Sequence, residues 1–226
     1  EIGRNLQERC LNGCESTTEA VGRFFDGYAE NFDAIYGHTN RRGRLGRWID
    51  RRFRKVMRLR FDEALRCVRE AGIESILDVG CGPGRYIASF ADAGVRVTGI
   101  DLADGMIGLA SDLVGERPGV ELIAGDYLKT EFEEPFDAAC LMGFFDYVTN
   151  PEDVINKVKV DVRKEFYGSF PKSKDPLALQ RRVRYKLRGC PLYMYECEDV
   201  KRLMVACGIS EFEIKDLGRD LFLRAT

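Results

Sequence analysis

The chain has few of the residues that metal and redox sites need. Among its 226 residues there is one histidine, and its eight cysteines are scattered without a C-x-x-C pair. Zinc sites are built from clusters of cysteine and histidine, so these absences argue against a metal centre. We therefore expect no metal cofactor, and we expect the cysteines to be reduced thiols.

Long apolar runs are missing as well. No segment approaches the roughly eighteen apolar residues of a membrane-spanning helix, and the first residues show no signal-peptide pattern. Hydrophobic residues make up 45% of the chain and charged residues 32%, a balance typical of one compact domain. We expect a single domain over residues 1–226 that acts in the cytoplasm.

Segments with the apolar spacing of strands alternate with segments that have the spacing of helices. Strands are expected at 75–80, 95–100, 120–124, 136–142, 165–170, 210–216 and 219–225. Helices are expected at 17–36, 45–71 and 197–207, and three more start near Gly84, Asp104 and Pro151. Alternation that ends in a hairpin predicts an α/β fold, with a doubly wound Rossmann-like sheet of seven mostly parallel strands whose last strand is antiparallel.

The most informative segment is residues 75–86, SILDVGCGPGRY, where an apolar strand runs into three alternate glycines. Asp101 ends the next expected strand. A glycine turn lets the backbone approach a ligand closely, and an acid at the tip of the following strand can accept hydrogen bonds from a ribose. Asp78 precedes the glycines, and position 85 is an arginine where a dinucleotide motif has glycine. We therefore expect a nucleoside ligand that carries a positive charge and no phosphate.

These residues resemble the class I S-adenosylmethionine-dependent methyltransferases, and further matches follow in that family's order. Residues 123–127, IAGDY, resemble the family's adenine segment, and residues 136–148, FDAACLMGFFDYV, resemble its fourth strand and substrate-facing turn. The likeness covers about residues 70–150. It implies S-adenosylmethionine as the cofactor and S-adenosylhomocysteine as the product.

The resemblance also implies roles for individual residues. The glycines would line the methionine part of the cofactor, Asp78 would lie near its amino group, and Asp101 would bind both ribose hydroxyls. Asp126 would reach the adenine amine, and Met106 would pack on the ring. The whole cofactor-binding set implied in this way is Asp78, Gly80, Gly82, Gly84, Asp101, Leu102, Met106, Asp126, Tyr127 and Met142.

Two segments, residues 1–45 and 171–195, lie outside the alternating pattern. Additions to an open α/β sheet gather where ligands bind, so the first is expected to be a helical lid and the second a substrate-side insertion. The expected substrate contacts are Tyr28 and Tyr36 in the lid, Phe145 after the fourth strand, and Arg182 and Tyr193 in the insertion. A plain helix-packing face is the alternative interpretation of the lid aromatics.

Methyl transfer from a sulfonium is an in-line displacement, which needs alignment of the acceptor and exclusion of water. A general base is required only where the acceptor keeps its proton. His38, which follows the lid helix, and Asp146, in the turn after the fourth strand, are the candidate catalytic residues. An exposed loop histidine without a role is the alternative for His38.

Basic residues are concentrated in two clusters, although the formal net charge is −2. One cluster lies between residues 41 and 60 and the other between 172 and 188. Such clusters suit an anionic acceptor or a nucleic acid, and a solvated helix face is the alternative. A small-molecule acceptor is the expected partner and nucleic acid the less favoured one; the sequence does not predict an oligomeric state.

The sequence therefore predicts methyl transfer to a small molecule. The expected acceptor atom is an oxygen, and a nitrogen is the second choice. The turn after the fourth strand lacks the Asn/Asp-Pro-Pro-Tyr sequence of enzymes that methylate exocyclic amines of nucleobases or glutamine. Two alternatives remain open. One is an RNA or tRNA methyltransferase that uses residues 41–60, and the other is a protein that uses the sulfonium for chemistry other than methyl transfer.

Overall fold

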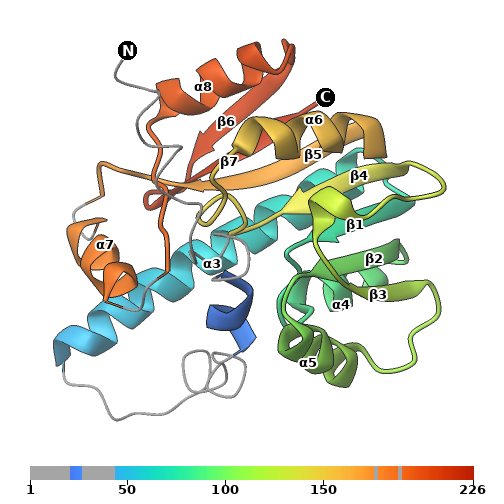
Figure 1. Cartoon of the computed structure of the whole chain (residues 1–226), viewed down its shortest axis with the longest axis horizontal. Helices are drawn as coiled ribbons and strands as arrows, with labels where there is room; N and C mark the ends of the chain where they lie inside the picture. The colour runs from blue at the N-terminus through green and yellow to red at the C-terminus, as the bar shows by residue number, and fades with distance from the viewer. Residues whose placement is uncertain (1–20, 27–43, 176–177, 188–189) are drawn as a thin grey trace, which may run out of the picture.

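The computed structural model describes residues 21–26, 44–175, 178–187 and 190–226, which form one seven-stranded sheet with helices on both faces (Figure 1). The strands are β1 Ser75–Val79, β2 Arg96–Asp101, β3 Val120–Ala124, β4 Phe136–Leu141, β5 Val162–Pro171, β6 Phe212–Asp216 and β7 Asp220–Ala225. The helices are α3 Arg44–Glu70, α4 Arg85–Asp92, α5 Asp104–Val114, α6 Pro151–Asp161, α7 Ala178–Lys186 and α8 Cys197–Ala206, with a short turn η1 Tyr127–Lys129 and a further helical stretch at residues 21–26.

The strand order is β3-β2-β1-β4-β5-β7-β6. All neighbours from β3 to β5 pair in parallel, whereas β7 runs antiparallel to both β5 and β6. Gly218, at φ +95°, makes the tight turn between β6 and β7. The expected sheet is thus confirmed, and the carboxyl ends of β1, β2 and β4 lie along one edge.

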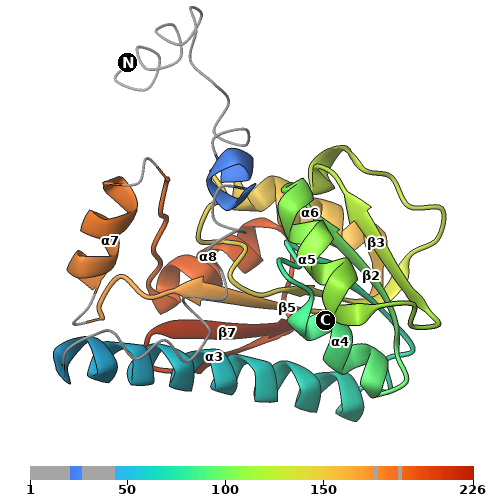
Figure 2. The ribbon, with the colours of Figure 1, turned by 90° about the horizontal axis from the view of Figure 1, so that it is seen from below.

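Two apolar cores lie on opposite faces of the sheet. Along β1, Leu77 points into the core beneath α6 and α8, and its neighbour Ile76 points into the core beneath α3, α4 and α5. Alternate strand residues face opposite sides, so a strand that is buried on both faces is apolar throughout. Figure 2 shows α3 running below β5 and β7, with α4 near its carboxyl end.

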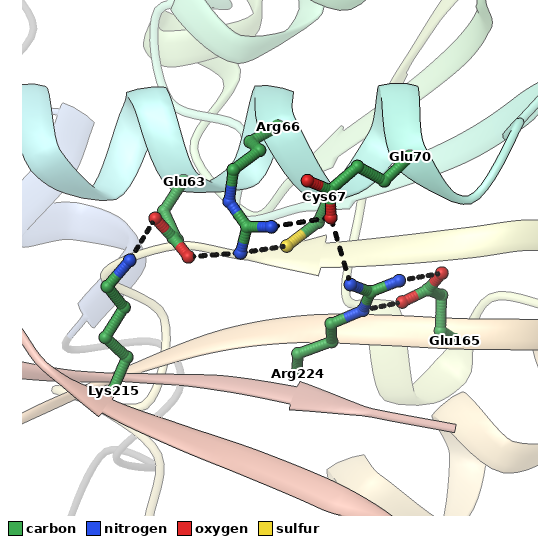
Figure 3. Close-up of polar contacts among 7 residues, drawn as sticks. All are labelled: Glu63, Arg66, Cys67, Glu70, Glu165, Lys215 and Arg224. Carbon is green, nitrogen blue, oxygen red and sulfur yellow. Dashed lines mark hydrogen bonds and ion pairs between the residues drawn. The ribbon is translucent and has the colours of Figure 1, made fainter.

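A polar network fastens α3 to the antiparallel end of the sheet (Figure 3). Lys215 on β6 reaches Glu63 at 2.8 Å, and Arg224 on β7 reaches Glu70 at 3.5 Å. Arg66 lies between the two glutamates and bonds to both. Partly exposed ion pairs contribute little energy singly, so the network chiefly sets the position of the helix.

Three elements differ from the sequence expectations. The structure places α7 inside residues 171–195, where the apolar spacing does not indicate a helix, because this helix turns its aliphatic side outward. Strand β5 begins at Val162, directly after α6, and so is longer than the expected 165–170. Of the expected helix at 17–36, only residues 21–26 are described, and they are helical.

Candidate cofactor and acceptor site

The glycine turn after β1 is shaped by left-handed backbone and by close neighbours. Gly80, Gly82 and Gly84 have φ values of +68°, +53° and +78°. A Cβ atom added at Gly80 would lie 2.7 Å from the Phe144 ring, and one at Gly84 would lie 3.0 Å from Ala110 Cβ on α5. A Cβ atom at Gly82 would meet nothing within 4 Å among the described residues. Packing therefore requires glycine at two positions, and the third leaves space for a ligand beside the backbone.

Asp101 ties this turn to the end of β2. Its Oδ2 accepts a hydrogen bond from the Gly82 N–H at 2.9 Å, and its Oδ1 accepts one from the Ala103 N–H at 2.9 Å. Burial raises the pKa of this carboxyl, and the two backbone donors act against that rise. A carboxylate has about four acceptor sites, so Asp101 can hold the turn and still accept from ribose hydroxyls.

Asp78 carries a buried oxygen that lacks a partner. The residue is 1% exposed, and its Oδ2 has no hydrogen bond within the described parts of the chain. Burial, and after it the charge of Asp101, raise the pKa of Asp78 to about 8, while a hydrogen bond with Cys140 lowers it. A buried polar atom without a partner is costly. An ammonium group at this place would satisfy the oxygen, so the site suits a cationic ligand.

The adenine segment is built around η1. The Asp126 side chain accepts from the Leu128 N–H at 3.1 Å and pairs with Lys129 at 3.3 Å. The Tyr127 ring lies in the core, and its hydroxyl donates to Asp161 on α6 at 2.8 Å. The Tyr127 side chain therefore serves the packing of α6, and only the backbone of this residue is left for a contact with a ligand.

The other expected cofactor residues lie on the same edge of the sheet. Met106, on α5, is 1% exposed, and Met142 follows β4 and is half-buried. The helical stretch at 21–26 packs close to Leu102: a Cβ atom added at Gly22 would lie 3.2 Å from the Leu102 side chain. Asp26 in the same stretch accepts from a backbone N–H in the first turn of α5 at 3.0 Å. The described part of the expected lid thus lies against the loop that follows Asp101.

Four half-buried aromatic rings from three segments meet near the end of β4, and we call them the aromatic cluster: Phe24, Phe25, Tyr147 and Tyr185. Phe25 packs edge-on against Tyr147 at 5.1 Å, and the Tyr147 hydroxyl donates to that of Tyr185 at 3.0 Å. Burial raises the pKa of Tyr147 well above its usual range, so its hydroxyl stays protonated. The cluster joins the stretch at 21–26, the turn after β4 and α7.

A buried ion network lies between α3, α7 and the sheet; its residues are Arg60, Asp146, Arg181 and Asp220. Arg181 pairs with Asp146 and, at 3.3 Å, with Asp220. Arg60 pairs with Asp220 at 3.3 Å and donates to the Ser169 hydroxyl at 3.0 Å. All four charged residues are less than a tenth exposed, and their charges balance.

This network changes the interpretation of Asp146. Burial raises the pKa of the Asp146 carboxyl and Arg181 opposes that rise, but the carboxylate is 3% exposed and bonded to the guanidinium. A general base must reach the proton that it removes. This placement gives Asp146 a positioning role at α7, and its expected role as a general base stays a prediction. The first basic cluster is divided in the same way. Arg60 is buried, so it does not belong to a solvated helix face, whereas Arg58 is exposed.

The expected substrate residues fall in different places. Phe145 is fully buried and stacks on Phe170 at 4.3 Å, so its ring belongs to the core. Arg182 is exposed, and the inward arginine on α7 is its neighbour Arg181. The Tyr193 hydroxyl lies 3.1 Å from the Thr149 hydroxyl in the exposed end of the turn after β4. His38, Tyr28 and Tyr36 lie outside the described residues.

Sequence reasoning missed several residues of this edge. Phe144 and Tyr147 lie in the turn that the sequence marks as substrate-facing, and Tyr185 lies within the second basic cluster, so the sequence contained a local pattern for each of them. Ser169 and Asp220 carry no such signal, because their roles depend on Arg60, which is far away in the chain.

Neither a metal cluster nor a spanning helix is found within the described ranges. There, no group of three or more His, Cys, Asp or Glu side chains is arranged to hold a metal ion, and no helix is both long and apolar enough to cross a membrane. The six cysteines of these ranges are free thiols.

Comparisons with known proteins agree with this geometry. Residues 76–163 match a family model described as a methyltransferase domain. Two proteins named ubiquinone biosynthesis O-methyltransferase, from Paraburkholderia phymatum and Chromobacterium violaceum, are 36% and 38% identical over 92 and 101 residues. These matches span 39% and 43% of this chain and the same shares of the two relatives.

Solved structures resemble a larger part of the chain. Magnesium protoporphyrin IX methyltransferase from Synechocystis PCC 6803, with bound SAH, has a TM-score of 0.72 at 17% identity and covers 93% of this chain and 99% of its own. Phospholethanolamine N-methyltransferase 2 from Haemonchus contortus has a TM-score of 0.69 at 14% identity, over 94% of this chain and 61% of that one. Likeness at such identities shows the fold, which is the Rossmann-like methyltransferase fold.

The fold is that of the methyltransferases, and the glycine turn with its two acids is the candidate nucleoside site within it. Residues 76–163, which contain this turn, are similar to the methyltransferase domain family, in agreement with the expected resemblance to class I S-adenosylmethionine-dependent methyltransferases.

Proposed function

We propose that this protein transfers a methyl group from S-adenosylmethionine to a small-molecule acceptor, to oxygen first and to nitrogen as the next choice. The observation that carries the proposal is the unpartnered buried oxygen of Asp78, which lies beside the turn that is open at Gly82. This arrangement suits a cationic nucleoside, and the Asp78 carboxyl is an unfavourable neighbour for a pyrophosphate. The names of the O-methyltransferase relatives support oxygen as the acceptor atom.

Asp78, Asp101 and Asp126 would hold the cofactor. Asp78 would pair with its amino group, Asp101 would accept from the ribose hydroxyls, and Asp126 would accept from the adenine amine. When bound, S-adenosylmethionine supplies an electrophilic methyl group on a sulfonium. Alignment and exclusion of water are the demands of such a displacement, so we propose no metal.

The acceptor would lie under the aromatic cluster. Its rings can exclude water from this edge, and the hydroxyls of Tyr147 and Tyr185, which are hydrogen-bonded to each other, place polar atoms among the rings. Arg60 and Arg181 are already paired with aspartates, so an anionic acceptor would depend on exposed residues such as Arg182.

The remaining sequence candidates keep their proposed roles. Tyr28, Tyr36 and Tyr193 are proposed acceptor contacts, and His38 is the proposed base where the acceptor holds its proton. We expect the protein to act in the cytoplasm.

The test measures the formation of S-adenosylhomocysteine when the protein is incubated with S-adenosylmethionine and one class of acceptor at a time: phenols, carboxylic acids, amines or tRNA. We expect product only with a small-molecule acceptor, and a product heavier by one methyl group. Activity confined to tRNA and lost at high salt would instead support the nucleic-acid alternative. Consumption of S-adenosylmethionine without S-adenosylhomocysteine would show chemistry other than methyl transfer. The variant Asp101→Ala serves as the control for background methylation.

A further inference from the structure

Helix α7 exposes its aliphatic side and buries an arginine. Leu179 and Val183 on the helix, and Leu187 just after it, are 73%, 50% and 82% exposed, whereas Arg181 is 8% exposed. Residues four apart lie on one side of a helix, so the three aliphatic residues form one line, which we call the α7 stripe. Arg181 lies on the opposite side, where it pairs with two aspartates.

The α7 stripe is unlike the other exposed apolar residues of the described chain. Those are single residues on four different elements, namely Leu113, Leu128, Val160 and Val205. Single exposed apolar residues are normal on a protein surface, whereas a contiguous line indicates a binding surface. Figures 1 and 2 both show α7 at one end of the molecule, the same end as the N-terminal part of α3, and away from α4 and α5.

The segment that carries the stripe is basic. Residues 176–195 contain five arginines and lysines and no acid, and Asp175 and Glu196 flank them. Arg182 and Lys186 are exposed, and each lies three residues after a member of the stripe, at its border. The surface is therefore an aliphatic line with a basic edge, which is complementary to a partner that is both apolar and anionic.

The buried ion network holds the helix in this orientation. Turning the stripe inward would carry Arg181 out of its pairs with Asp146 and Asp220 and leave buried carboxylates without that partner. Breaking a buried pair in this way is strongly unfavourable. The outward position of the stripe is thus built into the structure.

We propose that α7 docks on an anionic lipid surface. The α7 stripe would enter the boundary between headgroups and acyl chains, and Arg182 and Lys186 would reach lipid phosphates while their aliphatic stems stay on apolar surface. A second copy of this chain fits less well, because a symmetric contact through the stripe would bring the basic edges together. A protein partner fits less well too, because Tyr185, the aromatic residue of α7, is engaged in the aromatic cluster.

Vesicle flotation tests the proposal without cofactor or acceptor. We expect the wild-type protein to bind vesicles of phosphatidylcholine and phosphatidylglycerol, not vesicles of phosphatidylcholine alone, and to lose binding as salt rises. The variant Leu179→Gln/Leu187→Gln should bind about tenfold more weakly or worse. Each of Arg182→Gln and Lys186→Gln should weaken binding about fivefold.

The matched control is Val160→Gln/Val205→Gln, which removes two valines that are 76% and 68% exposed on α6 and α8. It should bind vesicles like the wild type, and urea unfolding of all variants verifies that they fold. Equal binding by the stripe variant and the wild type, or no binding to anionic vesicles, overturns the proposal. A wild-type dimer in light scattering that the stripe variant abolishes assigns the stripe to a second copy and also overturns it. None of these outcomes depends on methyl transfer.

Discussion

We call the glycine turn with Asp78 and Asp101 the cofactor edge, and the aromatic cluster with the buried ion network the acceptor edge; the two candidate edges are built in different ways. At the cofactor edge, backbone conformation sets the shape, and Gly82 and Asp101, which bond to each other, are 19 residues apart. At the acceptor edge, side chains form the structure, and Arg60 bonds to Ser169 across 109 residues. One edge is therefore a property of a local segment, and the other exists only once the chain is folded.

The two edges also treat charge differently. The buried ion network near α7 is balanced within itself, whereas Asp78 keeps an unpartnered oxygen at the glycine turn. A network of balanced charges positions helices and strands, whereas an unpartnered carboxyl oxygen can accept a hydrogen bond from a cationic ligand. The difference indicates that the cofactor edge is preorganised for one ligand chemistry, while the acceptor edge supports a helix and a set of rings.

The largest expected effect tests whether the acceptor edge depends on the buried network. Arg181→Met leaves two buried aspartates without their shared partner, so the free energy of unfolding should fall by about 3–5 kcal/mol in urea denaturation. Arg182→Met, at the exposed neighbour, should change it by less than about 0.5 kcal/mol. Equal losses in the two variants would show that the network does not hold α7.

The next effect separates the glycines of the cofactor edge. Gly80→Ala adds strain at positive φ of about 1–2 kcal/mol and a clash with Phe144 of about 1–3 kcal/mol. Gly82→Ala adds only the strain, because its Cβ atom meets no described neighbour. Chemical denaturation should rank the two variants in that order, and both should bind S-adenosylhomocysteine more weakly. Identical stability losses would contradict the close packing at Gly80.

Asp101→Ala tests the ribose contact. The affinity for S-adenosylmethionine should fall by about 1–3 kcal/mol, because hydroxyl groups and the turn both lose an acceptor. Isothermal titration calorimetry measures the change, and Asp112→Ala, an exposed acid on α5, is the control. An unchanged affinity in Asp101→Ala would remove this residue from the cofactor site.

The last prediction concerns pH and Asp78. Because the pKa of this carboxyl is raised to about 8 by burial, the folded protein without ligand keeps its proton between about pH 4 and 8, where the unfolded chain loses it. Stability should therefore decline as pH rises through that window, and Asp78→Asn should remove the decline.

Binding should show the opposite dependence on pH. A cationic amino group favours the ionised carboxyl, so S-adenosylmethionine binding releases a proton, and the affinity should rise by up to about tenfold per pH unit from pH 6 to 7. Calorimetry in buffers of different ionisation enthalpy detects the proton. The same slope in Asp78→Asn would assign the titration to another group.

Features that depend on a local segment could be predicted from the sequence, and features that depend on distant contacts could not. Strand β1, the turn at Gly80 and the acid at Asp101 could be predicted, because their apolar spacing and glycines encode local geometry. Helix α7 could not, since its large aliphatic residues face outward and Arg181 is buried. The turn that holds Asp146 and Phe145 could be predicted, but their partners Arg181 and Phe170 could not, because these lie distant in the sequence.

The central claim is that the Asp78–Asp101 edge binds the sulfonium nucleoside. The most direct measurement is a crystal structure of the protein with S-adenosylhomocysteine. We predict the nucleoside along the glycine turn, its amino group at Asp78 Oδ2 and both ribose hydroxyls at Asp101. Ligand bound elsewhere, with Asp78 Oδ2 still unpartnered, would contradict the claim.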